Sequence, residues 1–434
     1  MNCRVLIVAD HASAKFGGEA ALPFHYFRVL KKRNHPVWLV VHERTRKELE
    51  AHFPNDQSSI YYIHDTRLHQ FLFRVGKFLP QRITYLTTGF LLRLVTQFAQ
   101  RRMSKKLVRE LKIDVVHQPM PVSPKEPSML FGLNAPVVIG PMNGGMNFPV
   151  GFRHMQSRFV DWSVVLGRLS SSVINRIVPG KRHAMLVVAN PRTRAALPNG
   201  SSQQIFELVE NGIDLTLWRR RPGKQTHIET NVIDFVYMGR LVSLKAVDLL
   251  LEAFRIAANH HPISLRIIGD GPCRKELETQ AKALNLYSER SSECGKVFFP
   301  GWLSQEECAR QLVSVDALVL PSLHECGGAV ILEAMSAGLP VIATAWGGPL
   351  DYLDETCGIL VPPLSTQKFV DGLADAISRI SESHDLRKEM GAAGRAKVEQ
   401  FFDWETKVDR MLEIYQRAIS DWKKSLSSVK TTNC

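Results

Sequence analysis

The sequence predicts two α/β domains in tandem, each built on a parallel sheet covered by helices on both faces. Short, continuous apolar runs alternate with helical segments along the 434 residues, which is typical of strands buried on both faces of a parallel sheet. The pattern stops at a polar segment, 219–230, and then restarts. A chain of this length, 45% apolar and 22% charged, can form two or three cores, which excludes a disordered chain, a collagen and a small disulfide scaffold.

The predicted elements follow this division in order. Strands are expected in the first half at 4–9, 37–41, 60–63, 114–117, 136–139 and 185–189. In the second half they are expected at 234–238, 265–268, 297–299, 317–320, 340–343 and 358–361, with helices at 246–259 and 274–284 between them. Ligands of such sheets bind beyond the carboxyl ends of the strands. The domain boundaries are therefore set at 1–208 and 231–402, with a turn and linker at 209–230 and an amphipathic helix at 403–434 that packs back toward the first domain.

Positive charge is concentrated in the first half. Lys and Arg total 55 against 42 Asp and Glu, a formal net charge of +13. Segment 66–112 carries eleven basic residues and one acidic residue, Glu110, and segment 153–194 carries eight basic residues and one acidic residue, Asp161. Such a field implies an anionic partner. Nucleic acid is not expected to be that partner, because no recognised binding motif accompanies the charge.

Segment 66–112 is also apolar, and two interpretations of it stay open. It is either a helix that lies on an anionic membrane surface or an amphipathic helix packed on a core with a solvated basic face. Arg93 interrupts its longest apolar run, so no membrane span is expected. Its bulky apolar residues are Phe71, Leu72, Phe73, Val75, Phe78, Leu79, Phe90, Leu91, Leu92 and Phe98.

The cysteines and the first residues bear on the compartment. The seven cysteines are odd in number and form no Cys-x-x-Cys pair, which favours free thiols in a reducing compartment. The apolar run at 5–9 is too short for the core of a signal peptide. We therefore expect a cytoplasmic protein, peripheral on the inner face of the membrane if the first interpretation of 66–112 holds.

A glycine-rich loop after an expected strand of the second domain is the densest group of candidate site residues. Glu325 lies in this loop, and Gly327 and Gly328 allow the backbone to approach a ligand closely. A helix is expected to begin near Ala329, and its free N–H groups would form an anion site suited to a diphosphate. Glu333 adds a second carboxylate, and such a pair suits sugar hydroxyls. The alternative is a capping turn with two surface glutamates.

Three further loops follow expected strands of the second domain. Arg240 and Lys245 follow the strand at 234–238, where two cations could clamp a leaving phosphate; the alternative is a solvated basic loop. Gly269 belongs to a Gly-Asp-Gly-Pro loop that could also be a plain tight turn. Gly301 belongs to a Phe-Pro-Gly-Trp segment.

The order of these motifs resembles that of the retaining GT-B glycosyltransferases of family 4. Gly-Arg-Leu with a lysine five residues on is followed by Gly-Asp-Gly-Pro, Phe-Pro-Gly-Trp, Glu-x7-Glu and the Gly-Gly pair at 347–348. The resemblance covers most of the chain and is strongest over 209–363, where Val-Glu-Asn-Gly-Ile-Asp at 209–214 is similar to the family's interdomain turn.

The resemblance implies a fold and a reaction. The fold would be GT-B, an α/β fold of two tandem Rossmann-like, doubly wound domains with an interdomain cleft. The protein would move a sugar from a UDP-, GDP- or ADP-sugar to the hydroxyl of a sugar or lipid-linked acceptor, with retention of configuration and without a further cofactor. Such enzymes serve in polysaccharide, lipopolysaccharide or glycolipid synthesis.

The resemblance also implies roles for single residues. It places Arg240 and Lys245 on the donor diphosphate, Glu325 on the donor sugar and Glu333 on the nucleotide ribose. The backbone around Gly328 and Ala329 would face the sugar and the phosphate. Two neighbouring positions depart from the family pattern: Cys326 stands where an aromatic residue is common, and Ala246 stands where glycine is usual.

Candidate residues in the first half carry open alternatives. The pair Gly17 and Gly18 resembles the family's N-terminal glycine loop near the donor phosphates and the acceptor, or is a plain turn. His117 ends an expected strand, where family members often place an active-site histidine, although many carry it at the position of Pro119. A packed structural histidine is the alternative. The glycine-rich segment 140–145 could meet the acceptor.

The mechanism implied needs no metal. The sequence contains no Asp-x-Asp pair, so a metal-bridged diphosphate is not expected, and Arg240, Lys245 and the helix end after Gly328 would stabilise the leaving diphosphate. The family's front-face attack lets the leaving phosphate take the acceptor proton. Two alternatives stay open. A Rossmann oxidoreductase is disfavoured because no Gly-x-Gly-x-x-Gly follows the first strand, and a non-catalytic GT-B subunit that acts as a membrane-associated partner is disfavoured by the intact motif residues.

Overall fold

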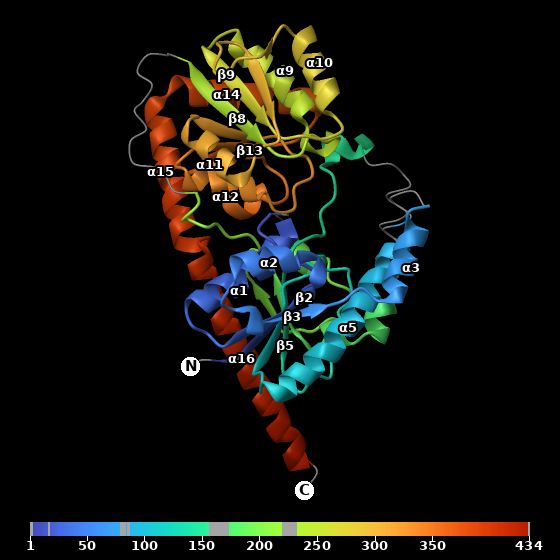
Figure 1. Cartoon of the computed structure of the whole chain (residues 1–434). Helices are drawn as coiled ribbons and strands as arrows, with labels where there is room; N and C mark the ends of the chain where they lie inside the picture. The colour runs from blue at the N-terminus through green and yellow to red at the C-terminus, as the bar shows by residue number, and fades with distance from the viewer. Residues whose placement is uncertain are drawn as a thin grey trace. The chain divides into compact units, whose positions relative to one another are not determined.

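The computed structural model describes residues 3–15, 18–78, 84, 87–155, 173–218 and 232–432. Their contacts divide the chain into two compact units, each with its own parallel sheet (Figure 1). The first unit comprises Met1–Gly145, Trp162–Glu210 and Lys407–Cys434, and the second comprises Met146–Asp161 and Asn211–Thr406. The predicted fold class, two Rossmann-like units each with a parallel sheet, is confirmed.

The first unit contains a seven-stranded sheet in the order β3-β2-β1-β4-β5-β6-β7, with every pairing parallel. The apolar runs in the sequence form its centre, because a strand covered on both faces has no polar side to show. Its strands are β1 (Val5–Val8), β2 (Val37–His42), β3 (Ile60–Ile63), β4 (Val115–Gln118), β5 (Val137–Met142), β6 (Met185–Val188) and β7 (Ile205–Glu207).

Helices of very different length surround this sheet. The C-terminal helix α16 (Trp404–Thr432) reaches it through Tyr415, which is fully buried. In the described part of this unit the other helices are α1 (Ala21–Lys32), α2 (Arg46–His52), α3 (Arg67–Gly76), α5 (Thr88–Glu110), α7 (Gly180–His183) and α8 (Pro191–Ala195). Short 3-10 helices lie there at η1 (Gly18–Ala20), η2 (Glu43–Thr45) and η3 (Gln57–Ser59).

The second unit contains a parallel sheet in the order β10-β11-β9-β8-β12-β13-β14. Its strands are β8 (Ile233–Met238), β9 (Ile263–Ile268), β10 (Tyr287–Ser288), β11 (Val297–Gly301), β12 (Ala317–Leu320), β13 (Val341–Thr344) and β14 (Gly358–Val361). Their Val- and Ile-rich sequences are buried throughout β9, β12 and β13. The order reverses direction between β8 and β12, which fixes where the sheet can hold a ligand.

The helices of the second unit pack around α9 (Val247–Ala258) and α12 (Ala329–Ser336), and α14 (Thr366–Glu382) also contacts α15 (His384–Phe401). Helix α9 contacts α10 (Arg274–Ala283) and α14. Helix α12 contacts α11 (Gln305–Val313), α13 (Pro349–Tyr352) and α15. Short 3-10 helices lie at η4 (Val150–Met155) and η5 (Ser243–Lys245). Among the residues described, no helix combines the length and the apolar character needed to cross a bilayer.

The structure differs from the sequence-based prediction at short and irregular elements. Strands β7 and β10 were not predicted, because three half-exposed residues and two residues carry no pattern that distinguishes a strand from a loop. The predicted first domain, 1–208, included segment 146–155, but this segment packs in the second unit. There the Phe148 ring lies 5.4 Å from that of His324, and Trp346 Nε1 donates to Asn147 O at 2.8 Å. The expected linker at 219–230 lies outside the described residues.

Candidate active site

The candidate site lies where the strand order of the second sheet reverses. Strand β8 pairs with β9 on one side and with β12 on the other. The carboxyl ends of strands at such a reversal are the usual ligand position in an open α/β sheet. The loop after β8 carries Arg240 and Lys245, and the loop after β12 carries Glu325.

An ion pair joins these two loops. Lys245 Nζ contacts Glu325 Oε2, and the two side chains are 18% and 14% exposed. A backbone hydrogen bond also joins the two loops, because Leu323 N donates to Leu244 O at 2.9 Å. The structure thus brings together Lys245 and Glu325, which the sequence separates by eighty positions. A half-buried pair of this kind is screened less by salt than a surface pair.

Arg240 is placed differently from Lys245. Its side chain is exposed, and its carbonyl accepts a hydrogen bond from the Tyr237 hydroxyl at 3.0 Å. Burial, followed by the nearby Glu325 carboxylate, raises the pKa of Tyr237 above its usual value. Tyr237 is therefore a neutral donor that fixes the start of the loop, a role that the sequence analysis missed because it lies inside an apolar strand.

Helix α12 follows the loop that holds Glu325 and begins without a side-chain cap. Gly328 occupies its N-cap position with a φ of +88°, in the left-handed region, and it supplies no side chain to the first N–H groups of the helix. These N–H groups are available to an anion, and the helix dipole favours negative charge there. The backbone of Gly348 packs closely against that of Gly327, because a Cβ on Gly348 would lie 2.1 Å from the Gly327 carbonyl oxygen. The Gly348 N–H donates to Glu325 O at 2.6 Å.

Three glycines lock the loops after β8, β9 and β11 together. Gly269 has a φ of +139°, and a Cβ at this position would lie 1.9 Å from the Gly239 carbonyl oxygen. Its N–H donates to Gly301 O at 2.8 Å. Gly301 itself has a φ of +89°, and a Cβ on it would lie 2.9 Å from the Arg274 guanidinium. Gly269 is therefore required by backbone approach at the carboxyl edge, whereas Gly301 is favoured by its left-handed φ, because the Arg274 side chain can move aside.

Glu333 lies on α12, behind the anion site. Burial raises its pKa to about 7. Its carboxylate is close enough to help raise the pKa of Cys308 on α11 to about 11, after burial as the main cause. A protonated Glu333 carboxyl could donate a hydrogen bond, whereas the ionised form could only accept one.

In the first unit, His117 is a packed core residue. It is fully buried in β4, its Nε2 lies 2.7 Å from Gly140 O, and its Nδ1 lies 2.6 Å from the Tyr415 hydroxyl. Burial lowers its pKa to about 4. Both ring nitrogens are engaged, and these contacts tie β4 to β5 and α16. This placement agrees with the alternative interpretation of His117 as a packed structural histidine.

The glycines proposed in the first half have mixed surroundings. Gly18 is exposed in η1 with a φ of +51°, and nothing lies within 4 Å of a Cβ built on it. Gly17 lies outside the described residues. Segment 140–145 is a strand end more than a loop, because Gly140 belongs to β5 and Asn143 is buried, donating to Glu210 Oε1 at 2.6 Å.

A segment from the first half contributes to the second unit beside the candidate site. Gly347 has a φ of +74°, and a Cβ on it would lie 2.5 Å from Glu325 O and 2.5 Å from Met146 Cε. Met146 and Phe148 therefore pack against the loop that holds Glu325. The sequence carried no signal for this contact, since an irregular apolar segment does not reveal what it packs on.

Part of the chain matches a family profile, and about half of its length matches curated relatives. Residues 220–397 match the family described as Glycosyl transferases group 1. The chain is 29% identical over 230 residues to D-inositol 3-phosphate glycosyltransferase of Saccharomonospora viridis, covering 50% of this chain and 51% of that protein. It is 32% identical over 230 residues to the Mycobacterium marinum protein of the same name, covering 50% and 46%. The chain thus spans about half the length of the curated relatives it matches.

Solved structures match almost the whole chain at lower identity. A glycosyltransferase from Rickettsia africae ESF-5 superposes with a TM-score of 0.65 at 16% identity, covering 96% of this chain and 99% of that one. HepE from Anabaena in complex with UDP superposes with a TM-score of 0.63 at 16% identity, covering 95% and 100%. At these identities the likeness is one of fold, and it extends over both units.

Proposed function

We propose that this chain, whose residues 220–397 match the family described as Glycosyl transferases group 1, transfers a sugar from a nucleoside-diphosphate sugar to an acceptor hydroxyl. One observation carries the proposal. The Lys245–Glu325 pair and the uncapped N-terminus of α12 meet at the reversal of strand order in the second sheet. That arrangement offers one cation and free N–H groups to a diphosphate, beside a carboxylate that can accept sugar hydroxyls.

The proposed reaction proceeds with retention and without a metal. Negative charge develops on the leaving diphosphate, and Lys245, the N–H groups of α12 and the exposed Arg240 stabilise it. Glu325 orients the donor sugar and Glu333 the ribose. The leaving phosphate takes the proton of the acceptor hydroxyl, so no side chain is assigned as general base. The donor is a UDP-, GDP- or ADP-sugar, and the acceptor is a sugar or a lipid-linked sugar in glycolipid or polysaccharide synthesis.

A donor screen tests the proposal. UDP-, GDP- and ADP-sugars are added separately and thermal unfolding is followed, because a ligand at 100 times its dissociation constant stabilises the folded state by about 2.7 kcal/mol. Release of nucleoside diphosphate is then measured with the stabilising donor. Binding with turnover supports the enzyme, whereas binding without turnover favours the non-catalytic subunit. A rise in the unfolding temperature with a nicotinamide dinucleotide, and with none of the nucleotide sugars, would contradict both the enzyme and the non-catalytic subunit.

Chelation should leave the reaction intact. The proposed charge stabilisation comes from Lys245, Arg240 and backbone N–H groups, none of which needs an ion. We expect nucleoside diphosphate release in excess EDTA at close to the untreated rate. A complete loss that Mg²⁺ restores would show that an ion holds the diphosphate. A metal-dependent glycosyltransferase assayed in the same buffer confirms that chelation is effective.

We also propose that the acceptor is reached from an anionic membrane surface, through α3 and α5. Helix α5 buries a polar side, because Thr96, Gln97 and Gln100 are each at most 4% exposed, while its Leu91 and Phe98 are 49% and 57% exposed. An ordinary surface helix turns apolar side chains to the core and polar ones to solvent, and this part of α5 does the reverse. Helix α3 adds an exposed stripe with the basic residues Arg67, Arg74 and Lys77 beside it, formed by Leu68, Phe71, Val75 and, just past the helix, Phe78.

The structure also sorts the basic residues of this region. Arg101 is a packing residue, because its guanidinium lies 4.0 Å from the centroid of the Phe131 ring and its Nε donates to Phe131 O at 3.0 Å. Its replacement would disturb the fold of the first unit. The cations suited to a test are therefore Arg67, Arg74 and Lys77 on and beside α3, which are exposed.

The protein should sediment with anionic vesicles at low salt. Each Lys or Arg near such a surface contributes about 1 kcal/mol, and salt should weaken binding by screening. Replacing Arg67, Arg74 and Lys77 by Gln should reduce the bound fraction without changing donor hydrolysis. Removing the same charge from the second unit, at Lys275, Lys368 and Lys388, serves as the matched control and should have a smaller effect. Failure of the unmodified protein to bind at low ionic strength would contradict the membrane proposal.

A further inference from the structure

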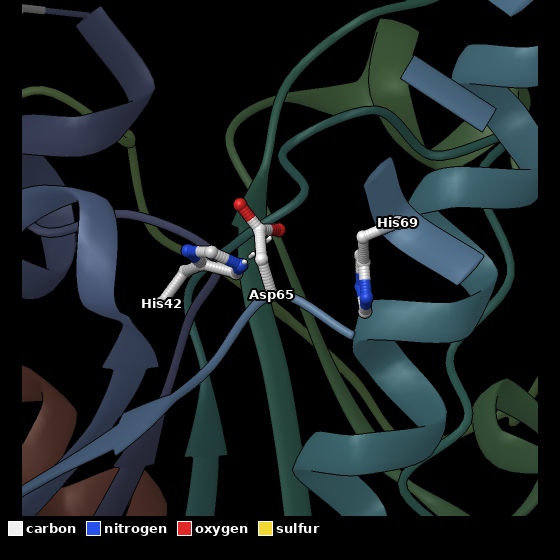
Figure 2. A group of neighbouring side chains, drawn as sticks. All are labelled: His42, Asp65 and His69. Carbon is white, nitrogen blue, oxygen red and sulfur yellow. Dashed lines mark ion pairs between the residues drawn. The ribbon is translucent and has the colours of Figure 1, made fainter. Parts of the chain in front are cut away.

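Three potential metal ligands meet at the carboxyl edge of the first unit's sheet (Figure 2). His42 is the last residue of β2, Asp65 follows β3, and His69 lies in the first turn of α3. Strands β2 and β3 pair in parallel with His42 opposite Ile63, which brings Asp65 to the His42 side chain. One ring nitrogen of each histidine and one carboxylate oxygen lie within 4.8 Å of one another.

Both nitrogens of the His42 ring have polar neighbours. His42 is 1% exposed, its Nδ1 accepts from Arg44 N at 3.3 Å, and its Nε2 lies 3.2 Å from Asp65 Oδ1. Because Nδ1 accepts from a backbone N–H, the neutral ring carries its proton on Nε2, toward the carboxylate. A metal ion bound at Nε2 would take the place of that proton, with the tautomer shifted to Nδ1–H.

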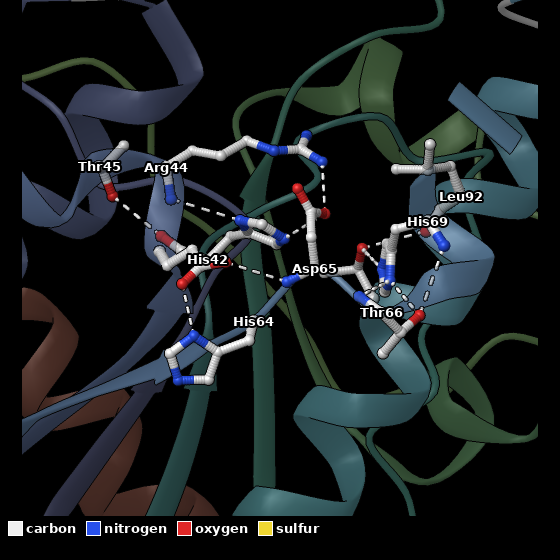
Figure 3. Close-up of polar contacts among 10 residues, drawn as sticks. His42, Arg44, Thr45, His64, Asp65, Thr66, His69 and Leu92 are labelled. Atoms are coloured by element: carbon white, nitrogen blue, oxygen red, sulfur yellow. Dashed lines mark hydrogen bonds and ion pairs between the residues drawn. The ribbon is translucent and has the colours of Figure 1, made fainter. Parts of the chain in front are cut away.

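His69 is oriented in the manner of a metal-binding histidine. It is 1% exposed, and polar contacts surround its ring (Figure 3). Its Nε2 lies 3.1 Å from Thr96 Oγ1, while that hydroxyl donates to Leu92 O at 3.0 Å. The Thr96 oxygen therefore accepts the Nε2 proton, which leaves the lone pair on Nδ1. A second hydrogen bond that fixes the tautomer in this way accompanies most metal-bound histidines.

We propose that His42, Asp65 and His69 bind one Zn²⁺ ion, with water in the remaining position. Two imidazoles and a carboxylate suit zinc, whereas Mg²⁺ and Ca²⁺ prefer oxygen ligands. Ligands about 2.0–2.1 Å from a tetrahedral zinc lie about 3.3 Å apart, so the three side chains must close in from their present spacing. Asp65 is 34% exposed, which leaves room for that rotation and a path for the ion.

Two protein contacts compete with the ion. Arg44 Nη2 donates to Asp65 Oδ1 at 2.9 Å, and Thr66 N and Oγ1 lie 3.1 and 2.8 Å from His69 Nδ1. Arg44 is 42% exposed and can turn into solvent when zinc takes its carboxylate. The ion would join β2, the segment after β3 and the start of α3, and so fix the helix that carries the exposed apolar stripe. This role is independent of the donor site and of the proposed reaction.

Zinc binding to the full chain tests the proposal. The protein is dialysed against a chelator, and Zn²⁺ is added in a calorimetric titration at neutral pH, where one ion per chain is expected. Zn²⁺ should raise the thermal midpoint, and Co²⁺ in its place should give the intense visible absorption of a four-coordinate site. Asp65→Asn and His42→Gln should each lower the affinity at least about tenfold, since even the loss of a residue that only orients a ligand costs about 10–100-fold.

Three further variants separate coordination from a general effect on folding. Arg44→Gln should tighten zinc binding, because it removes the competing cation from Asp65. Thr96→Val should weaken it by about 10–100-fold. His64→Ala is the matched control, since His64 is 66% exposed beside Asp65 but pairs with Glu43, and the affinity should not change. Absence of stoichiometric zinc binding in the unmodified chain would overturn the proposal. So would a zinc affinity in Asp65→Asn and His42→Gln that equals that of the unmodified chain.

Discussion

Lys245→Ala should lower kcat/KM for sugar transfer by about 10²–10³-fold, the range for loss of one preorganised charge donor to a transition state. In the free protein Lys245 pairs with Glu325 at the reversal of strand order. In the proposed reaction it meets the charge that develops on the leaving diphosphate. The measurement is the initial rate of nucleoside diphosphate release at donor concentrations below KM.

Two controls make this result specific to the site. Lys275→Ala removes an exposed lysine from α10 in the same unit, and its rate should equal that of the unmodified protein. Glu325→Gln separates the two members of the pair. Because each residue leaves the other without its charge partner, the double variant should lose less than the product of the two single losses. A folded Lys245→Ala protein with an unchanged rate would remove Lys245 from the mechanism.

Gly269→Ala should destabilise the second unit by about 3 kcal/mol or more, the upper part of the range for forced overpacking. Its Cβ would lie 1.9 Å from the Gly239 carbonyl oxygen, and both partners are backbone, so neither can move aside by changing rotamer. The φ of +139° at Gly269 adds strain for any residue with a side chain. Urea unfolding, compared at constant m, gives the change in free energy. Transfer activity should fall with it, because the loops after β8 and β9 would separate.

Gly295→Ala provides the matched comparison. Gly295 has a φ of +71°, in the left-handed region, but nothing lies within 4 Å of a Cβ at this position. Its replacement should therefore cost only the backbone strain, about 1–2 kcal/mol. Equal destabilisation by the two substitutions would mean that backbone conformation alone, and not the approach of Gly269 to Gly239, limits the loop.

The preference for glycine at the position of Ala246 has a structural cause. Ala246 stands where glycine is usual, and the structure places it at a φ of +49°, the left-handed conformation that glycine adopts without strain. The sequence revealed the departure but not the reason for it. The strain sits between Lys245 and the first turn of α9, so it bears directly on how that lysine is presented.

The sequence by itself determined the elements whose signals are local. Continuous apolar runs identified the long and central strands, because burial on both faces removes polar residues from a strand whatever surrounds it. The order of the glycine and charged motifs carried the resemblance that implies a donor site, and the positions of these motifs after strands placed them at one edge of a parallel sheet. Short edge elements such as β7 and β10 escaped, since two or three residues cannot show a period.

Only the tertiary structure decided which of these residues meet. Lys245 and Glu325 pair because β12 lies beside β8, a neighbour relation that no local pattern encodes. His117 is a core residue because α16, from the far end of the chain, brings the Tyr415 hydroxyl to its ring. His42, Asp65 and His69 gather because the register of β2 on β3 aligns their ends. Periodicity reports whether a side chain is buried, whereas the partner it is buried against depends on strand order and register, which are set by long-range packing.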